Sequence, residues 1–208
     1  MKVTASTQGS MIAKIFEDCP YPEAMQAVIG DGLTPVDPAW VMDKRNEAVG
    51  TPYQNSLWSP YFDTDLGCAS TDKRIHLFSH SKQLRKVTLS TKITNCALPV
   101  NGDESKTIDR KDVILDRPLT EKEARSHALL LELAEGDQNR LDNYVENAYR
   151  IGKDAFGMER VMSVRIPYDS TLTLRAVVFG GYPSRLSILG DRLMTTDKAR
   201  LIGIGKMQ

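Results

Sequence analysis

A run of positive charge is the most distinctive chemical feature of this 208-residue sequence. The twenty residues from Lys73 to Lys92 hold six lysines and arginines and no aspartate or glutamate. Such a density of cations suits a phosphate backbone, because each neutralised phosphate releases counterions. The same run is also typical of a solvated hairpin whose lysines block edge-to-edge aggregation. The candidate contacts are Lys73, Arg74, His80, Lys82, Arg85, Lys86 and Lys92.

A loop bounded by glycines is the second candidate for ligand contact. Gly152, Lys153 and Gly157 stand between a predicted helix and a predicted strand. Glycines let a backbone approach a ligand closely, and exposed N–H groups there can hold a phosphate. We expect the helix to end at Gly152, Gly157 to open the next strand and Lys153 to be exposed. The alternative is a simple helix cap at Gly152 and a turn at Gly157.

The C-terminal segment 180–208 is rich in glycine and arginine. Arg185 and Arg192 are its candidate RNA contacts, because a basic, glycine-rich strand and loop can follow a nucleic-acid backbone. The same segment could equally be a strand with exposed arginines.

Catalytic patterns are weak along the chain. Neither a GxSxG nor an HExxH pattern occurs. His76, His80 and His127 could each act as a general base near neutral pH. None has a partner at a spacing that indicates an active site. We therefore predict a protein that is not an enzyme, with no catalytic residue, no metal site and no cofactor.

The formal net charge is zero, but the charge is unevenly distributed. Residues 1–72 carry ten acidic and four basic residues, whereas residues 150–208 carry five acidic and ten basic residues. A polarised chain can present a basic face that its total charge hides. The acidic first third would then face another protein or solvent.

The three cysteines are an odd number and lie far apart, at Cys19, Cys68 and Cys96. This spacing favours neither a disulfide framework nor a CxxC metal site. No stretch approaches the roughly 18 apolar residues of a membrane span, and the first residues lack the apolar core of a signal peptide. We expect a cytoplasmic protein that makes no contact with membranes.

Periodicity predicts a strand over 1–8, a helix from Pro22 to Gly30 and an irregular insertion over 30–60. Residues 73–98 are predicted to form a basic hairpin that turns at 79–83. Thr120 and Glu123 match a capping box. Residues 127–136 are predicted as a buried strand, although a helix fits nearly as well. A helix capped by Asp137 and strands over 159–166 and 171–179 follow.

This order predicts a single α+β domain. It is close to the ferredoxin-like (RAMP/RRM-like) β-α-β-β-α-β plan, with insertions and with the basic β-hairpin as a projecting thumb.

The stretch 129–166 resembles the second half of the RAMP proteins of CRISPR systems. In that family a strand ends in a Gly-Asp turn, and a helix and a glycine loop follow. The resemblance is strongest to the 5′-handle-binding, crRNA-capping subunit of type IV CRISPR effector complexes. The sequence departs from the family pattern at Asp154, where a basic residue is usual, and at Glu159, where glycine is usual. The matching residues are Gly136-Asp137, Ile151-Gly152-Lys153 and Gly157.

The resemblance implies a non-catalytic RNA-binding subunit of a CRISPR ribonucleoprotein. Such a subunit binds the 5′ handle of the guide RNA and caps a filament of backbone subunits, and it contacts a large subunit near the target DNA duplex. Two alternatives remain open. A RAMP-type endoribonuclease would process repeat RNA with His76 or His80 as its base, and a phage or plasmid structural protein would use the basic hairpin as an assembly contact.

Overall fold

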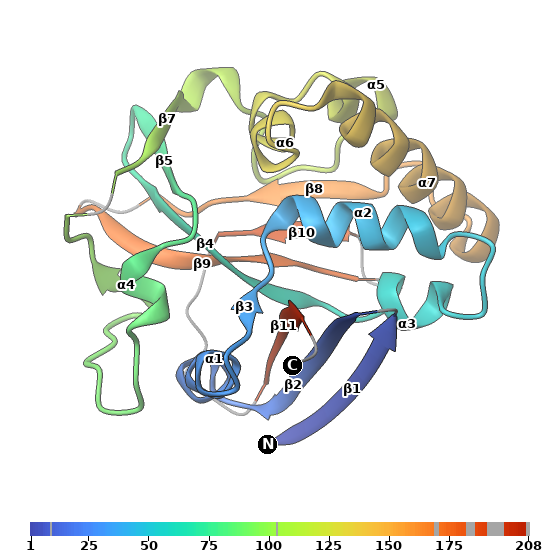
Figure 1. Ribbon diagram of the computed structural model, residues 1–208. Coiled ribbons are helices and arrows are strands. Elements are labelled where there is room, and N and C mark those ends of the chain that lie inside the picture. Colours follow the sequence, from blue (N-terminus) through green and yellow to red (C-terminus); the bar gives the residue numbers. More distant parts are fainter. Residues whose placement is uncertain (9, 103, 169–170, 182–185, 191–197, 207–208) are drawn as a thin grey trace.

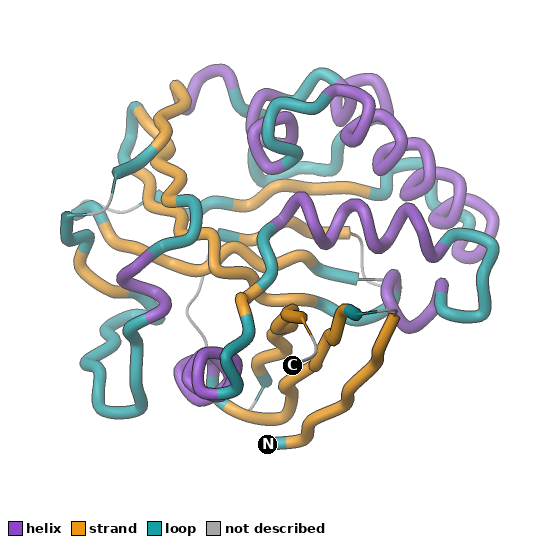
Figure 2. The backbone as a smooth tube through the Cα atoms, viewed as in Figure 1, coloured by secondary structure: helices purple, strands orange, loops and turns teal. Residues whose placement is uncertain are grey.

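A mixed β-sheet forms the centre of the molecule, and helices pack on its faces (Figures 1 and 2). The computed structural model describes residues 1–8, 10–102, 104–168, 171–181, 186–190 and 198–206. Its helices are α1 (Tyr21–Gly30), α2 (Pro38–Ala48), α3 (Gln54–Trp58), α4 (Lys82–Arg85), the 3-10 turn η1 (Arg110–Asp112), α5 (Glu121–Arg125), α6 (Ala128–Leu133) and α7 (Gln138–Phe156). Its strands are β1 (Lys2–Gln8), β2 (Met11–Cys19), β3 (Thr34–Pro35), β4 (Phe62–Ser70), β5 (Arg74–Phe78), β6 (Leu98–Pro99), β7 (Lys106–Asp109), β8 (Met162–Arg165), β9 (Thr173–Phe179), β10 (Leu186–Leu189) and β11 (Ala199–Lys206).

The strand order joins the two ends of the chain. The main path runs β1-β2-β11-β4-β9-β10-β8, and β5 branches from β4 to pair with β7. Because β11 pairs with β2 on one side and with β4 on the other, the last strand sits inside the sheet next to the first hairpin. Most pairs are antiparallel, and β8–β10 and β4–β11 are parallel.

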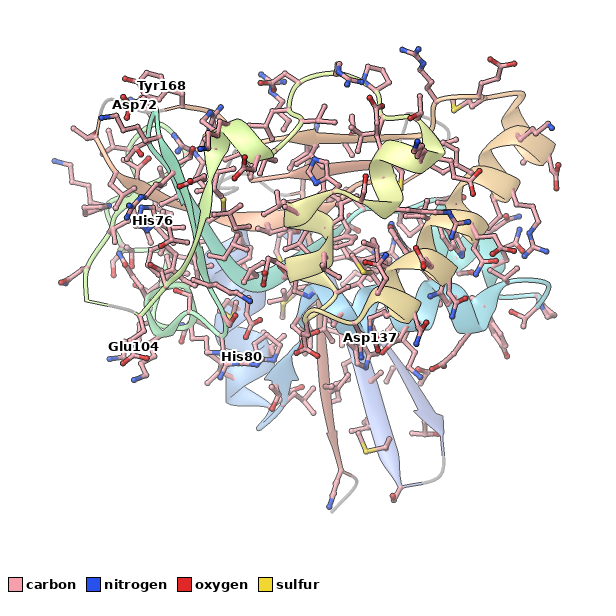
Figure 3. All side chains as sticks on the ribbon, turned by 90° about the horizontal axis from the view of Figure 1, so that it is seen from above. Asp72, His76, His80, Glu104, Asp137 and Tyr168 are labelled. Carbon is pink, nitrogen blue, oxygen red and sulfur yellow. The ribbon has the colours of Figure 1, made fainter. Side chains whose placement is uncertain are left out.

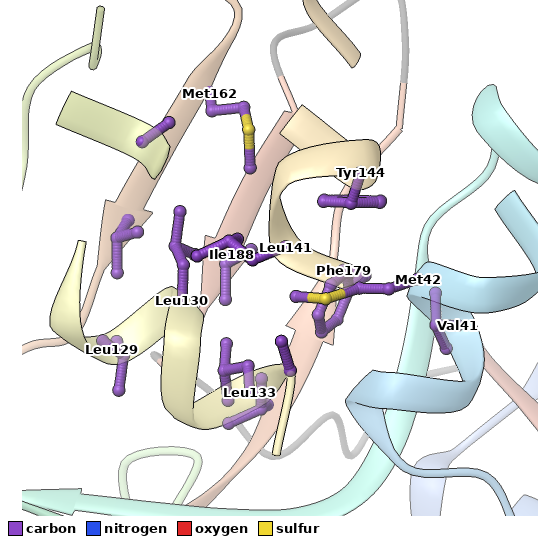
Figure 4. Packing of buried hydrophobic residues seen from close by; sticks show 14 of the residues in the cluster. Val41, Met42, Leu129, Leu130, Leu133, Leu141, Tyr144, Met162, Phe179 and Ile188 are labelled. Atoms are coloured by element: carbon purple, nitrogen blue, oxygen red, sulfur yellow. The ribbon is translucent and has the colours of Figure 1, made fainter. Parts of the chain in front are cut away.

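Two apolar cores lie on the two faces of the sheet. Helices α2, α5, α6 and α7 cover one face, and α1 and α4 cover the other (Figure 1). Alternation along β9 serves both cores, because successive strand residues point to opposite faces. Leu174 and Ala176 join the core under α1, whereas Val177 and Phe179 join the core under α7. Figure 4 shows Tyr144 and Leu141 of α7 packed with Phe179 and Ile188 in the larger core.

Local capping signals place several helices where the sequence predicts them. The Thr120–Glu123 capping box is present at the start of α5. The Asp137 side chain accepts a hydrogen bond from the Arg140 amide at the start of α7. Helix α1 has proline in its first turn and ends at Gly30. These predictions are confirmed.

The predicted ferredoxin-like β-α-β-β-α-β plan is wrong, since the described residues form an eleven-stranded mixed sheet. Segment 30–60 is no irregular insertion, because Asp37 caps α2 through the Trp40 amide and Pro38 occupies its first turn. Residues 127–136 contain helix α6 rather than the predicted strand. The His127 side chain caps that helix, and the larger core takes up its leucines.

Candidate functional site

A polar hollow lies where the chain leaves β5. It has a volume of about 360 Å³ and is lined by Ser79, His80, Lys82, Gly102 and Glu104. On its inner side His80 also borders a small cavity of about 40 Å³, whose lining includes Asp65 of β4 and Asp37. Figure 3 shows His80 and Glu104 at the same end of the molecule, while His76 lies further along β5. Ser79 and His80 therefore line both spaces.

The backbone at His80 is held in the left-handed region, with φ of 49°. This conformation costs an L-residue roughly 1–2 kcal/mol. The next residue keeps the turn in place, because the Ser81 amide donates to the Asp65 carbonyl at 3.1 Å and the Ser81 hydroxyl accepts from the Leu84 amide at 3.2 Å. Such strain persists where the surroundings impose it, and it is frequent at functional sites.

A buried carboxylate anchors the hollow from below. The Asp65 side chain is 0% exposed. Its Oδ2 accepts from Arg85 Nε at 3.1 Å and Nη2 at 2.5 Å, and it lies 3.1 Å from His80 Nδ1. Its Oδ1 has no hydrogen-bond partner among the described residues. Burial raises the pKa of Asp65 above its ordinary value, and the hydrogen bonds from Arg85 and His80 oppose that rise.

The His80–Asp65 contact has the form of an orienting pair for a general base. Arg85 weakens this pairing. Its guanidinium already pairs with the Asp65 oxygen that faces the imidazole, and its Nη2 lies 3.2 Å from His80 Nδ1. Among the described residues, no serine, threonine or cysteine side chain hydrogen-bonds to His80. The arrangement positions a half-exposed imidazole beside a ligand-sized space.

The predicted basic hairpin is wrong, although its residues contribute to this site. Strand β5 pairs with β4 and β7, and the chain then forms α4. The Gln26 side chain of α1 donates to the carbonyls of Arg85 and Val87, which ties the segment to the smaller core. His80 and Lys82 line the hollow, and Arg85 turns inward to Asp65. The remaining candidates, Lys73, Arg74, Lys86 and Lys92, are exposed and do not line it.

Beyond α4 the chain makes a short turn that the sequence did not predict. Thr94 and Ala97 exchange two backbone hydrogen bonds of 3.0 Å. Asn95 and Cys96 take positive φ between them, at 52° and 56°. Both side chains are exposed, so Cys96 presents its thiol at the surface.

The predicted phosphate-binding loop at Gly152 and Lys153 is wrong, because both residues belong to α7. The helix continues to Phe156, and Gly157 ends it in the left-handed conformation with φ of 64°. The carbonyls of Gly152 and Lys153 accept from the amides of Met158 and Gly157. Lys153 is exposed, as predicted. Arg185 and Arg192 lie outside the described residues.

The other two histidines lie away from the hollow. His76 Nδ1 is 3.2 Å from the Ser105 hydroxyl, and burial together with Arg74 lowers the His76 pKa. His127 is buried at the start of α6. The sequence analysis overlooked Asp65, Ser79 and Glu104. The available signal was an acidic residue within a strand that is buried along its whole length.

Within the described residues, no group of three or more histidine, cysteine, aspartate or glutamate side chains is arranged to hold a metal ion. None of the described helices is long and apolar enough to cross a membrane.

Comparisons with known proteins bear on the fold. No protein-family model and no curated protein matches this sequence. The structure is similar to a solved structure described as "Accommodation of massive sequence variation in Nanoarchaeota by the C-type lectin fold". The TM-score is 0.72 at 14% sequence identity, and the match covers 93% of this chain and 97% of the other.

The identity of 14% limits this likeness to the fold. The finding overturns the expected RAMP family, together with the CRISPR and RNA-binding assignments that followed from it. The glycine and charge pattern of 129–166 is explained instead by a capped and continuous α7. The chain has the architecture of a C-type lectin fold.

Proposed function

We propose that this protein is a non-catalytic binding module that holds a polar ligand group in the hollow at His80. The observation that carries the proposal is the strained His80 turn, fixed over the buried Asp65 carboxylate and its partly exposed partner Arg85, beside a space of about 360 Å³. Ligand sites are concave and largely preformed, with a few polar groups that set orientation. The ion pair between the buried Asp65 and the partly exposed Arg85 fixes the base of the hollow before any ligand binds.

The lining favours a ligand that carries both hydrogen-bond acceptors and donors. Lys82 offers an ammonium group and Glu104 offers a carboxylate, and neither forms an ion pair with a described residue. Ser79 and His80 can each donate or accept. A hydroxyl-rich or zwitterionic group would satisfy both charges at once, whereas a purely anionic group would face Glu104.

Two further points support binding over catalysis. The Asp65 carboxylate is already neutralised by Arg85, so it gives the imidazole little help as a base. The similar structure is described as a fold that accommodates massive sequence variation. A scaffold that tolerates such variation suits recognition of varied ligands, where surface residues change and the core does not.

A titration of the ¹⁵N-labelled protein with free amino acids and monosaccharides, followed by NMR, tests the proposal. We expect at least one of these probes to shift the amide signals of Ser79, His80 and Gly102 in a saturable way. Lys82→Ala should abolish the shifts. Lys86→Ala is the matched control, because it removes a nearby exposed cation that does not line the hollow. Shifts that persist in Lys82→Ala, or no saturable shift with any probe, would refute the proposal.

A further inference from the structure

Strand β1 forms an edge of the main sheet. All seven of its residues pair with β2, and no described strand pairs with its other side. Residues 2–7 are exposed. Figure 1 shows β1 on the outside of the sheet next to β2 and the C-terminal strand. An edge of this kind presents unpaired backbone N–H and C=O groups, which are a template for another strand.

The usual devices that protect such an edge are missing from β1. From Val3 to Ala13 the sequence contains no charged residue and no proline. The pairing with β2 runs in regular register from Lys2 to Gln8, without a bulge. Val3 is 47% exposed although it is apolar. The strand is therefore regular in register, uncharged from Val3 to Gln8 and open to pairing.

We propose that β1 pairs antiparallel with β1 of a second copy of this chain, about a two-fold axis at Ala5. This register is self-complementary, as a two-fold interface requires. It sets Ala5 against Ala5 of the second copy, Thr4 against Ser6, Val3 against Thr7, and Lys2 against Gln8. All of the facing side chains except the terminal pair are small and uncharged.

Electrostatics favour a second copy as the occupant. Lys2 is the single charge on β1, and its ammonium is already paired with Glu17 at 2.8 Å. The antiparallel register puts the two Lys2 residues at opposite ends, about 20 Å apart at roughly 3.3 Å per residue. The formal net charge of the chain is zero, so the two copies do not repel each other at long range.

Pairing would also extend an apolar hollow beside this hairpin. That hollow has a volume of about 400 Å³, and its lining includes Ser6, Trp40 and Ile204. Residues directly opposite each other in an antiparallel pair share a face of the sheet. Thr4 of the second copy would therefore stand beside Ser6 at the rim of the hollow. The dimer would therefore extend the sheet that lines this apolar hollow.

Sedimentation velocity across a concentration series tests this proposal on the full chain. A single strand pair buries less than the roughly 1,200 Å² of a standard interface, so we expect a dimer that dissociates on dilution. Ala5→Lys and Ala5→Glu should each sediment as monomers, because like charges then face each other across the axis. An equimolar mixture of the two variants should restore the dimer.

Thr7→Lys is the matched control, because it adds the same charge at a position that faces Val3 of the second copy and should keep the dimer. Circular dichroism establishes that each variant is folded, and restoration in the mixture excludes misfolding as the cause of the monomers. A wild-type protein that stays monomeric at all concentrations, an Ala5→Lys variant that dimerises like wild type, or a mixture that stays monomeric would each overturn the proposal.

Discussion

Arg45 Nη1 donates a 2.9 Å hydrogen bond to the hydroxyl of Tyr144, and this bond joins α2 to α7 across 99 positions of sequence. The Arg45 side chain is fully buried. Three further guanidinium hydrogens go to the carbonyls of Leu57, Pro60 and Gly180 at 2.9–3.0 Å. The guanidinium carbon lies 5.6–5.9 Å from the ring centroids of Trp58, Phe62 and Phe179. Carbonyl dipoles and aromatic faces hold this cation, and no described carboxylate pairs with it.

Replacing Arg45 should be among the most damaging changes in the chain. Arg45→Met keeps much of the volume but leaves three carbonyls and the Tyr144 hydroxyl without their donor. We expect a loss of about 3–5 kcal/mol in the free energy of unfolding. Tyr144→Phe removes one bond and should cost about 1–2 kcal/mol. Urea unfolding at pH 7 measures both values, and a loss under 1 kcal/mol for Arg45→Met would contradict the role assigned to it.

His127 should make the protein less stable in mild acid. The Leu130 amide donates to its Nδ1, and its Nε2 donates to the Ile114 carbonyl at 2.9 Å, so the buried ring is neutral. Burial lowers its pKa below the ordinary value of 6.5. The unfolded chain therefore takes up a proton first, and stability falls as the pH drops through 6.5.

His127→Gln removes this titration. The difference in unfolding free energy between wild type and variant should shrink as the pH is lowered from 8 to 5.5. A difference that does not depend on pH would show that the pKa of His127 is the same in the folded and the unfolded chain, and would contradict this prediction.

Glu123 should make the free energy of unfolding depend on pH between 4.5 and 2. Two bonds from Arg117 and one from the Thr120 amide lower the pKa of its carboxyl to about 2, from an ordinary value of 4.5. Its contribution is fully present above pH 4.5 and is lost as the pH falls from 4.5 towards 2. Acid unfolding of Glu123→Gln, followed by circular dichroism, should show a weaker pH dependence within that window. Parallel acid limbs for wild type and variant would contradict the assignment.

Gly157 should resist substitution because of its backbone alone. Its φ is 64°, and a Cβ added there would meet nothing within 4 Å. Gly157→Ala should therefore cost about 1 kcal/mol through conformational strain without any clash. Gly30→Ala is the control, since Gly30 also has open space but lacks a positive φ. Thermal unfolding should show a lower midpoint for the first variant and no loss for the second.

The sequence predicted the helix starts correctly where a capping side chain bonds to the backbone within the first turn. Thr120 and Asp137 mark helix starts, because their side chains accept hydrogen bonds from the backbone amides three residues later. Asp37 followed by Pro38 carries the same kind of signal, but the prolines of segment 30–60 were interpreted as turn residues. Leu141, Tyr144, Val145 and Ala148 recur at helical spacing along α7, and all four side chains are buried.

Long-range pairing explains what the sequence could not predict. Nothing near Leu201 or Ile202 indicates that β11 inserts between β2 and β4, more than a hundred residues earlier in the chain. The same limit applies to the site. His80 and Lys82 were visible as part of a charged run, whereas their relation to Asp65 arises only because β4 passes beneath them. Arg85 was predicted to face a ligand and instead neutralises that aspartate.

The turn at 94–97 carries the one cysteine whose thiol is exposed. Cys19 and Cys68 are buried, and burial raises the pKa of both thiols, that of Cys68 to about 12. Cys96 stands exposed on a turn whose backbone is fixed by two hydrogen bonds. A maleimide fluorophore should therefore attach at one position in the native state, without mutagenesis. Its polarisation would report the tumbling of the whole molecule.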